Sequence, residues 1–186
     1  MNLHFESVNL ELIADGAHYQ RLVQKVMCEA RFSLWIATAT LKDTRIEQEF
    51  LSYRSIVENF DNMANRGCEI RILYGSEPSK GFQNSLQQHN PKVFLRCCPR
   101  VHSKIVLVDG YQLYLGSANL TGAGLGAKAS HRRNFELGIF TRHLPLIREV
   151  REYFETIWDR RTCQDCCQLS LCRHIKSEIF SYDRSI

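Results

Sequence analysis

The most informative segment of the chain is VHSKIVLVDGYQLYLGSANLTG, which runs from Val101 to Gly122. Two apolar-rich runs in it flank the dipeptide Asp109-Gly110. This dipeptide is typical of a two-residue β-hairpin turn, because glycine adopts a positive φ without steric cost. Counting outward from the turn predicts that His102 and Ser117 are direct neighbours across a hairpin.

One face of this hairpin gathers polar groups. Strand side chains alternate, so His102 and Lys104 share a face, and Ser117 and Asn119 join it from the second strand. An ammonium, a hydroxyl and a carboxamide are donors suited to phosphate oxygens, and an imidazole can attack phosphorus or transfer a proton near pH 7. No Asp or Glu cluster suited to magnesium accompanies them in the sequence. We therefore expect phosphoryl transfer that needs no cofactor, and Asp109, of opposite parity, is assigned to the turn.

The alternative interpretation is a surface hairpin with one incidental histidine. A tripeptide His-x-Lys alone is weak evidence, because His174-Ile175-Lys176 repeats it near the C-terminus. In that repeat Ser181 stands where an aspartate would be needed. We attribute the repeat to chance and count one copy of the motif in the chain.

The whole pattern resembles the HKD signature of the phospholipase D superfamily, in the form His102-x-Lys104-x4-Asp109-x6-Gly116-Ser117-x-Asn119. Asn134-Phe135-Glu136 resembles a downstream Asn-x-Glu element of that family, whose glutamate orients the histidine. A carboxylate at Glu136 could accept from the second ring nitrogen of His102 and fix its tautomer; an exposed strand residue is the alternative. The resemblance implies a set of catalytic residues, namely His102, Lys104, Asp109, Ser117, Asn119 and Glu136, with Asn134 contacting the substrate.

The resemblance also implies a homodimer. Family active sites consist of two such motifs, in which one histidine forms a phosphohistidine and the other protonates the leaving oxygen and later activates water. A single motif places this chain with the short, nuclease-like subfamily, where two copies of the chain complete one site. One imidazole must then be neutral while the other is protonated, so we expect a bell-shaped pH–rate profile.

Apolar periodicity predicts strands that alternate with helices along the chain. The predicted elements are helices at 18–30, 45–66 and 144–158 and strands at 32–40, 68–74, 93–96, 101–108, 111–117 and 134–141, with a short edge strand at 8–12. The polar stretch 75–91 is expected to be a loop with room for one helical turn. The order from Phe32 to Trp158 also resembles the fold of the same superfamily. We expect a single-domain α/β/α sandwich, a mixed β-sheet flanked by helices, over residues 1–159, and a Cys-rich C-terminal tail over 160–186.

Positive charge is concentrated in one segment. The 186-residue chain has a net charge of +4, but Lys92 to Arg133 contains seven basic residues and one acid and therefore carries +6. Such a segment favours an anionic partner, most commonly nucleic acid. We expect a groove that follows a phosphate backbone, lined by Arg96, Arg100, Arg132 and Arg133; a solvated basic face is the alternative.

Three classes of function fit these residues. We favour a metal-independent phosphodiesterase or endonuclease that cleaves DNA or RNA, because the chain is short and has no apolar run near the roughly 18 residues of a membrane helix. A lipid phosphodiesterase or phosphatidyl transferase is the first alternative, and would be expected to carry an amphipathic anchor. A non-catalytic nucleic-acid-binding subunit is the second. The first 15 residues lack the basic start of a secretory signal, so we expect a cytoplasmic protein without a membrane anchor.

Four of the eight cysteines crowd into ten residues of the tail, at Cys163, Cys166, Cys167 and Cys172. Dense thiolates suit a structural zinc ion or an iron–sulfur cluster. The spacing matches neither the common zinc-finger pattern nor the bacterial ferredoxin run, and a redox-sensitive tail is the alternative. The other four cysteines lie among apolar residues and are expected to be reduced and buried.

Overall fold

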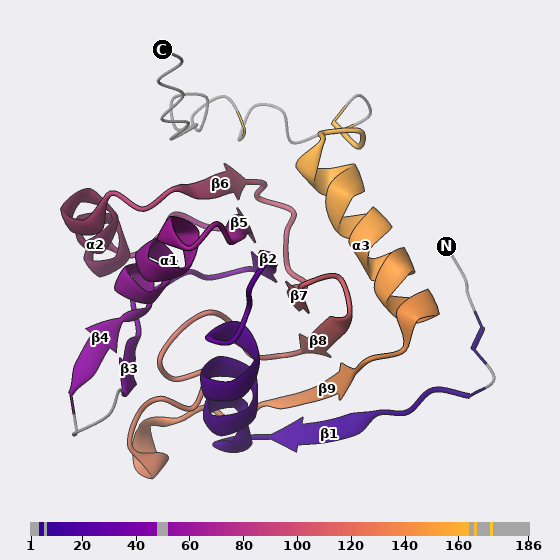
Figure 1. Ribbon diagram of the computed structural model, residues 1–186, viewed down its shortest axis with the longest axis horizontal. Helices are drawn as coiled ribbons and strands as arrows, with labels where there is room; N and C mark the ends of the chain where they lie inside the picture. Colours follow the sequence, from indigo (N-terminus) through magenta and orange to yellow (C-terminus); the bar gives the residue numbers. More distant parts are fainter. Residues whose placement is uncertain (1–3, 6, 48–51, 164–165, 167–171, 173–186) are drawn as a thin grey trace.

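The computed structural model describes residues 4–5, 7–47, 52–163, 166 and 172. Its centre is a seven-stranded sheet in the order β1-β9-β8-β7-β2-β5-β6 (Figure 1). β2, β5 and β6 run parallel to one another, and the remaining neighbours are antiparallel. The strands are β1 (Glu11–Ala14), β2 (Ser33–Thr38), β5 (Glu69–Tyr74), β6 (Val93–Cys97), β7 (Lys104–Val108), β8 (Gln112–Gly116) and β9 (Leu137–Thr141).

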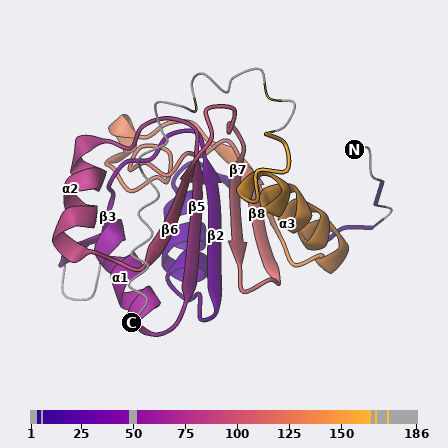
Figure 2. The same cartoon turned by 90° about the horizontal axis from the view of Figure 1, so that it is seen from above.

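Helices cover both faces of this sheet (Figure 2). The π-helix η1 (His18–Met27) and α1 (Ile56–Asn65) cover one face, and α2 (Lys80–His89) packs beside α1. The opposite face is covered by α3 (Leu144–Trp158), whose predicted bounds match the structure. The expected α/β fold with a mixed sheet flanked by helices is therefore confirmed.

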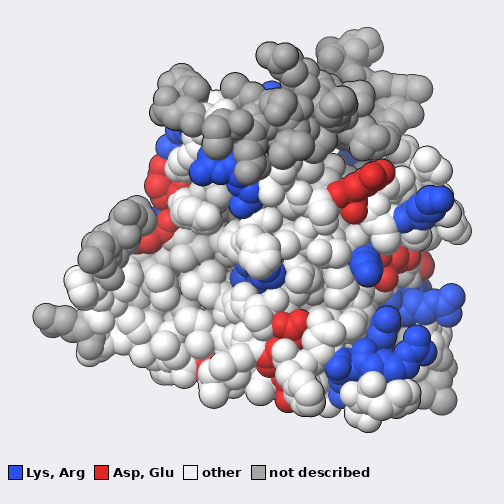
Figure 3. Space-filling model, turned by 180° about the vertical axis from the view of Figure 1, so that it is seen from behind, with Lys and Arg blue, Asp and Glu red and all other residues white. Residues whose placement is uncertain are grey.

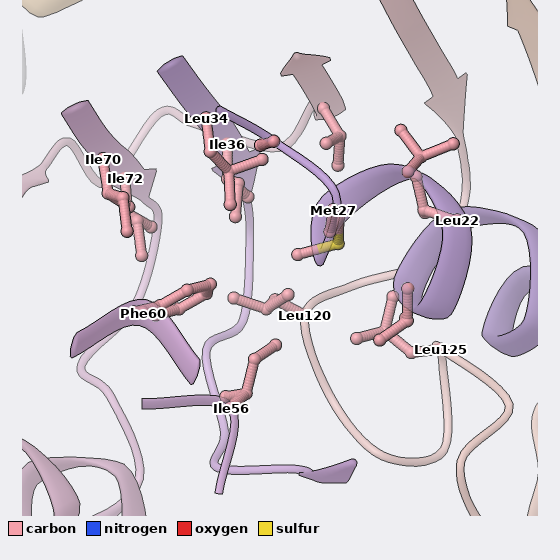
Figure 4. Close-up of a cluster of buried hydrophobic side chains, with 14 of the residues drawn as sticks. Leu22, Met27, Leu34, Ile36, Ile56, Phe60, Ile70, Ile72, Leu120 and Leu125 are labelled. Carbon is pink, nitrogen blue, oxygen red and sulfur yellow. The ribbon is translucent and has the colours of Figure 1, made fainter. Parts of the chain in front are cut away.

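Alternation along the strands divides the apolar residues between two cores. In β2, Leu34 and Ile36 point to the larger core under η1 and α1, whereas Trp35 and Ala37 point towards α3. Figure 4 shows the larger core, in which the strand residues face Phe60 of α1. Full burial of such side chains stabilises the fold by about 1.5–3 kcal/mol each.

Aromatic stacking builds the smaller core. The rings of Trp35 and Phe154 have centroids 5.3 Å apart, and those of Phe154 and Trp158 are 5.8 Å apart. The guanidinium carbons of Arg71 and Arg96 lie 4.6 Å and 4.8 Å from the ring centroids of Trp35 and Trp158. Arg96 was expected in the basic groove but stacks on Trp158 and so contributes to the packing of α3 against the sheet.

Two sequence expectations about helices were wrong. In place of the first half of a long helix, β3 (Arg45–Glu47) and β4 (Tyr53–Ser55) form an antiparallel pair of strands. Tyr53 of β4 is 57% exposed, and the hydroxyl of Ser55 caps α1 by accepting from Val57 N at 3.0 Å.

The second wrong expectation is the loop at 75–91, which contains α2. The polar composition of this stretch did not indicate α2, whose one buried residue is Phe82. The hydroxyl of Ser79 accepts from Phe82 N at 3.3 Å at the start, and Asn90 ends the helix with a left-handed φ of 46°.

The central hairpin forms, but its register differs from the prediction by one residue. A two-residue turn would place Val108 opposite Tyr111, whereas Val108 pairs with Gln112 and Lys104 pairs with Gly116. Asp109 and Gly110 both have positive φ, 52° and 71°, and Tyr111 is the extra residue of the turn. A shift of one residue exchanges the faces of a strand, so His102 and Ser117 are not direct cross-strand neighbours.

Candidate active site

The residues singled out by the motif lie around one end of the central strands. Lys104 is the first residue of β7, Ser117 follows the last residue of β8, and Glu136 precedes the first residue of β9. Asn119 contacts the segment that leaves β2. This end contains the carboxyl ends of the parallel strands, which is the usual place for ligands in open α/β sheets.

Lys104 holds His102 by two contacts. Its ammonium donates to the carbonyl oxygen of His102 at 2.6 Å, and Nζ lies 3.1 Å from Nδ1 of the imidazole. Lys104 is 9% exposed, whereas the side chain of His102 is exposed. Burial lowers the pKa of Lys104, and the charge of Glu136 acts in the opposite direction. The pair presents an accessible imidazole beside a buried positive charge.

Glu136 is held by two neighbours. Its Oε2 accepts from the hydroxyl of Ser117, and its Oε1 accepts from Nδ2 of Asn134 at 3.0 Å. The backbone N–H of Leu137 donates to the Ser117 oxygen at 3.1 Å, and the N–H of Glu136 donates to Asp15 Oδ1 at 3.0 Å. Both carboxylate oxygens therefore have partners, and the side chain is 9% exposed.

These contacts correct the expected role of Glu136. We expected its carboxylate to accept from a ring nitrogen of His102, but in the described part of the chain that nitrogen contacts Lys104 instead. Glu136 orients Ser117 and Asn134, so Ser117 points its proton at a carboxylate and not into an open site. The pairing of β8 with β9 explains the contact between Ser117 and Glu136, because Gly116 pairs with Gly138 and Ser117 N donates to the Leu137 carbonyl at 3.0 Å.

Asn119 is fixed through its oxygen. Oδ1 accepts from the backbone N–H groups of Ala39 and Thr40, each at 3.1 Å, and from the hydroxyl of Thr38 at 3.3 Å. The same hydroxyl accepts from the N–H of Leu120 at 3.0 Å. With Oδ1 engaged, Nδ2 is the atom of this amide that can donate to a phosphate.

Asp109 lies at the opposite end of β7 from Lys104. Its carboxylate accepts from three successive backbone N–H groups, those of Arg31, Phe32 and Ser33, at distances of 2.7–3.2 Å. These contacts tie the hairpin turn to the start of β2. They agree with the structural role that its parity suggested, although the residue belongs to the named motif.

We expect Asp109→Ala to lower the free energy of unfolding by about 2–3 kcal/mol, because it removes a charged acceptor from three backbone donors and places alanine at a positive φ. Asp109→Asn keeps one oxygen and tolerates the left-handed backbone, so its loss should be smaller. Denaturant unfolding checks both. A fall in kcat for the folded Asp109→Ala protein, with unchanged stability, would contradict the structural role.

Tyr114 is a supporting residue of the site that no motif in the sequence indicated. Its hydroxyl lies 2.9 Å from Nε2 of the buried His18, whose Nδ1 donates to the carbonyl of Asp15 at 2.9 Å. Burial raises the pKa of Tyr114 to about 12. A Cβ at Gly138 would lie 2.3 Å from this ring, so the glycine is required there.

The predicted basic groove is only partly supported by geometry. Arg132 and Arg133 are exposed around the short 3-10 helix η3 (Ser130–Arg132), and Arg100 is exposed before the motif. Figure 3 views the molecule from behind, and in it Lys and Arg side chains gather at the lower right, where the segment that carries η3 lies. The side chain of Arg133 also donates to the carbonyl of Lys128 and so folds back on its own loop.

Three of the predicted tail ligands, Cys163, Cys166 and Cys172, are described, and Cys167 lies outside the described residues. Among the residues that the structure describes, no group of three His, Cys, Asp or Glu side chains is placed to hold a metal ion. Two of the scattered cysteines, Cys28 and Cys68, are free thiols whose pKa is raised by burial to about 11.

Fold and site together define a class: an α/β/α sandwich that presents one histidine–lysine pair, a serine, an asparagine and a glutamate at one end of a central hairpin. The family model described as "Cardiolipin synthase, PLD-like domain" matches residues 23–158, which include all of these groups. The chain belongs to this phospholipase D-like family.

Solved structures share the fold at low sequence identity. NucT from Helicobacter pylori is 15% identical with a TM-score of 0.61, and the match covers 82% of this chain and 97% of that one. Nuc from Salmonella typhimurium, described as a phospholipase D family member, is 15% identical with a TM-score of 0.60, over 82% and 95%. The archaeal chromatin protein TrmBL2 is 13% identical with a TM-score of 0.52, over 85% and 55%. No curated protein matches the sequence.

Within the described residues, none of the helices has the length and apolarity that crossing a bilayer requires.

Proposed function

We propose that the chain is a phosphodiesterase that cleaves nucleic-acid backbones through a phosphohistidine on His102, and that two copies form the working enzyme. The contact that carries this proposal is the one between the buried Lys104 ammonium and the exposed His102 imidazole. A nucleophile beside a fixed positive charge is what attack on an anionic phosphodiester needs.

The chemistry uses two imidazoles. A ring nitrogen of His102 attacks phosphorus, the bond from phosphorus to the leaving oxygen breaks, and that oxygen takes a proton from the partner subunit's His102. Water then attacks the phosphohistidine, gives a proton to the partner subunit's His102 and releases the phosphomonoester. A phosphate oxygen is a stronger acceptor than a neutral imidazole, so substrate draws the Lys104 ammonium from Nδ1 and frees the ring. These coupled imidazoles give a bell-shaped pH–rate profile.

Nucleic acid is the substrate that the charge supports. Arg100, Arg132 and Arg133 are exposed, and the segment from Lys92 to Arg133 carries +6. Positive charges spread over a surface can each bind a different phosphate of a nucleic-acid backbone, whereas a single lipid headgroup can engage only a few of them. TrmBL2 is described as having a novel mode of DNA binding, so a protein that contains this fold can bind such a ligand.

The second copy is supported by an exposed apolar strip beside the half-site. Leu12 of β1 is 69% exposed and Leu137 of β9 is 56% exposed. Both lie on the α3 side of the sheet, because they share a face with Ile139, and Ile139 pairs with Leu115, which packs against the smaller core. Phe135, next to Glu136, is 97% exposed. The strip is continuous with the site, since Leu137 N donates to Ser117. A self-complementary contact through it would place two His102 imidazoles near one phosphate.

We expect hydrolysis of single- or double-stranded DNA or RNA to continue in chelator at a rate within about twofold of that in its absence, because protein groups supply the charge. The assay compares these substrates with phospholipid vesicles and records metal content in parallel. Cleavage that needs added magnesium or manganese would contradict the proposed mechanism. Turnover of lipid alone would favour phosphatidyl chemistry, the alternative that the description of the family model suggests. Binding without turnover would indicate the non-catalytic subunit.

A further inference from the structure

His18 is a fully buried histidine outside the motif, at the start of η1. Its Nδ1 donates to the carbonyl oxygen of Asp15 at 2.9 Å, and its Nε2 lies 2.9 Å from the hydroxyl oxygen of Tyr114. The rings of His18 and Tyr114 also meet edge to face, with their centroids 5.4 Å apart. Because both ring nitrogens have partners in a buried place, the orientation of the imidazole is fixed.

The contact with Asp15 leads to Glu136. Asp15 has a left-handed φ of 45°, a conformation that a residue other than glycine keeps only when its neighbours hold it. Its N–H donates to the Glu136 carbonyl at 2.9 Å, and its Oδ1 accepts from the Glu136 N–H at 3.0 Å. The Asp15 carbonyl accepts from the backbone N–H of His18 at 3.1 Å as well as from the imidazole. His18 therefore fixes the residue to which the backbone of Glu136 is bonded.

The contact with Tyr114 leads to the segment that carries Ser117. Gly116 and Gly138 pair across β8 and β9, and a Cβ at either glycine would clash with the tyrosine side chain. The phenol ring thus lies directly against the backbone that precedes Ser117. Burial raises the pKa of the Tyr114 hydroxyl, and a hydrogen bond from the backbone N–H of Ala118 acts in the opposite direction. Tyr114 therefore supports the backbone on both sides of Ser117.

The two supported segments meet again at the site. The hydroxyl of Ser117 donates to Oε2 of Glu136, and this contact closes a ring of contacts that starts and ends at His18. His18 is 0% exposed and Tyr114 is 1% exposed, so neither side chain can touch a substrate. Any effect of His18 on the reaction must act through the positions of Ser117 and Glu136.

We propose that His18 is a positioning residue, which sets the hydroxyl of Ser117 and the carboxylate of Glu136 at fixed places relative to each other. Its effect on catalysis rests on the phosphodiesterase function proposed above. A displacement of about 1 Å in a catalytic site can lower the rate by about 100-fold. A histidine that only completed the core would lower stability when removed and leave kcat of the folded protein unchanged, so the two roles predict different kinetics.

The first measurement is steady-state cleavage of a labelled oligonucleotide by folded protein. We expect kcat of His18→Ala to fall by about 10–100-fold, with KM within about twofold of the wild type. The matched control is Val26→Ala, which removes a buried side chain from the larger core near the other end of η1 and should keep kcat within about twofold. His18→Asn retains a donor near the position of Nδ1 and should recover most of the lost kcat. Tyr114→Phe keeps the ring against both glycines and removes only the hydroxyl; its kcat should fall by about 5–20-fold, and it replaces His18→Ala if that variant does not fold.

The second measurement needs no substrate. Hydrogen exchange of the Glu136 amide, followed by NMR, reports the bond to Asp15 directly. The exchange rate should be at least about tenfold higher in His18→Ala than in Val26→Ala, after each is referred to the amides of β2 in the same protein.

Two results would overturn the proposal. Equal exchange of the Glu136 amide in His18→Ala and Val26→Ala would make His18 a residue of the core alone. Faster exchange with an unchanged kcat would show that the reaction does not depend on this support. If the wild type cleaves no phosphodiester, the proposed function fails, and the exchange rates still decide whether His18 holds Glu136 in place.

Discussion

His102→Ala is expected to abolish phosphodiesterase activity, with a fall in kcat/KM of at least about 10⁴-fold. In a symmetric dimer one substitution removes both the nucleophile and the group that protonates the leaving oxygen, so no His102 remains to perform either step. The imidazole is exposed and the backbone carbonyl that Lys104 binds is retained. The free energy of unfolding should therefore change by no more than about 0.5 kcal/mol.

The measurement is single-turnover cleavage of a labelled oligonucleotide in chelator, at equal concentrations of folded protein. His174→Ala is the matched control, since it removes the histidine of the second His-x-Lys tripeptide, and it should retain wild-type rates. Acid-labile phosphate bound to the wild type and absent from His102→Ala would identify the intermediate. A His102→Ala protein within tenfold of the wild-type rate would refute the assignment of the nucleophile.

Leu12→Glu is expected to separate the dimer and, with it, the activity. A twofold interface carries the substitution twice, and about 3 kcal/mol of lost association energy raises the dimer Kd by roughly 150-fold. The side chain of Leu12 is exposed and makes none of the side-chain contacts of His102 and Glu136, so each half-site should remain intact. Activity per chain should fall by about 100-fold at dilute protein and recover as the protein concentration rises.

Sedimentation equilibrium and activity measured over the same concentration range check this prediction. Phe32→Glu is the control: it also places an acid at an exposed apolar position, 75% exposed, but near the Asp109 turn at the other end of the sheet. It should leave both association and activity unchanged. A monomeric Leu12→Glu protein with full activity at every concentration would show that one chain holds a complete site.

The sequence was sufficient to predict the architecture where apolar periodicity and turn residues agreed. The helix from Leu144 to Trp158 and the strands around the motif follow from such agreement. The prediction failed for residues 45–66, where two short strands and a helix have an apolar spacing that also fits one long helix. The spacing from Ile46 onward fits a helix as well as a hairpin, and only the cap at Ser55 marks the true start of α1.

The candidate site was predicted in composition better than in contacts. The positions of Lys104, Ser117 and Glu136 at one end of the strands follow from the motif, but the direct neighbours across the β7–β8 hairpin depend on a single residue of register. Tyr111 adds that residue to the turn. Side-chain partners across such a turn can be known only once its φ angles are known, and a dipeptide such as Asp-Gly is compatible with more than one loop length.

Asp109 and Lys104 mark the two ends of β7, and this gives the motif a physical dimension. The five-residue step from lysine to aspartate equals the length of one strand, about 16 Å at the rise of extended chain. Lys104 lies at the end of the strand where phosphate would bind. Asp109 lies at the opposite end, where its carboxylate accepts from the backbone N–H groups of Arg31–Ser33. The spacing between the lysine and the aspartate therefore matches the length of the sheet along its strands. If one residue were inserted between them, Asp109 could reach the backbone N–H groups of Arg31–Ser33 only if the side chain of Lys104 turned to the α3 side of the sheet. A spacing that is longer by one residue is therefore incompatible with both positions.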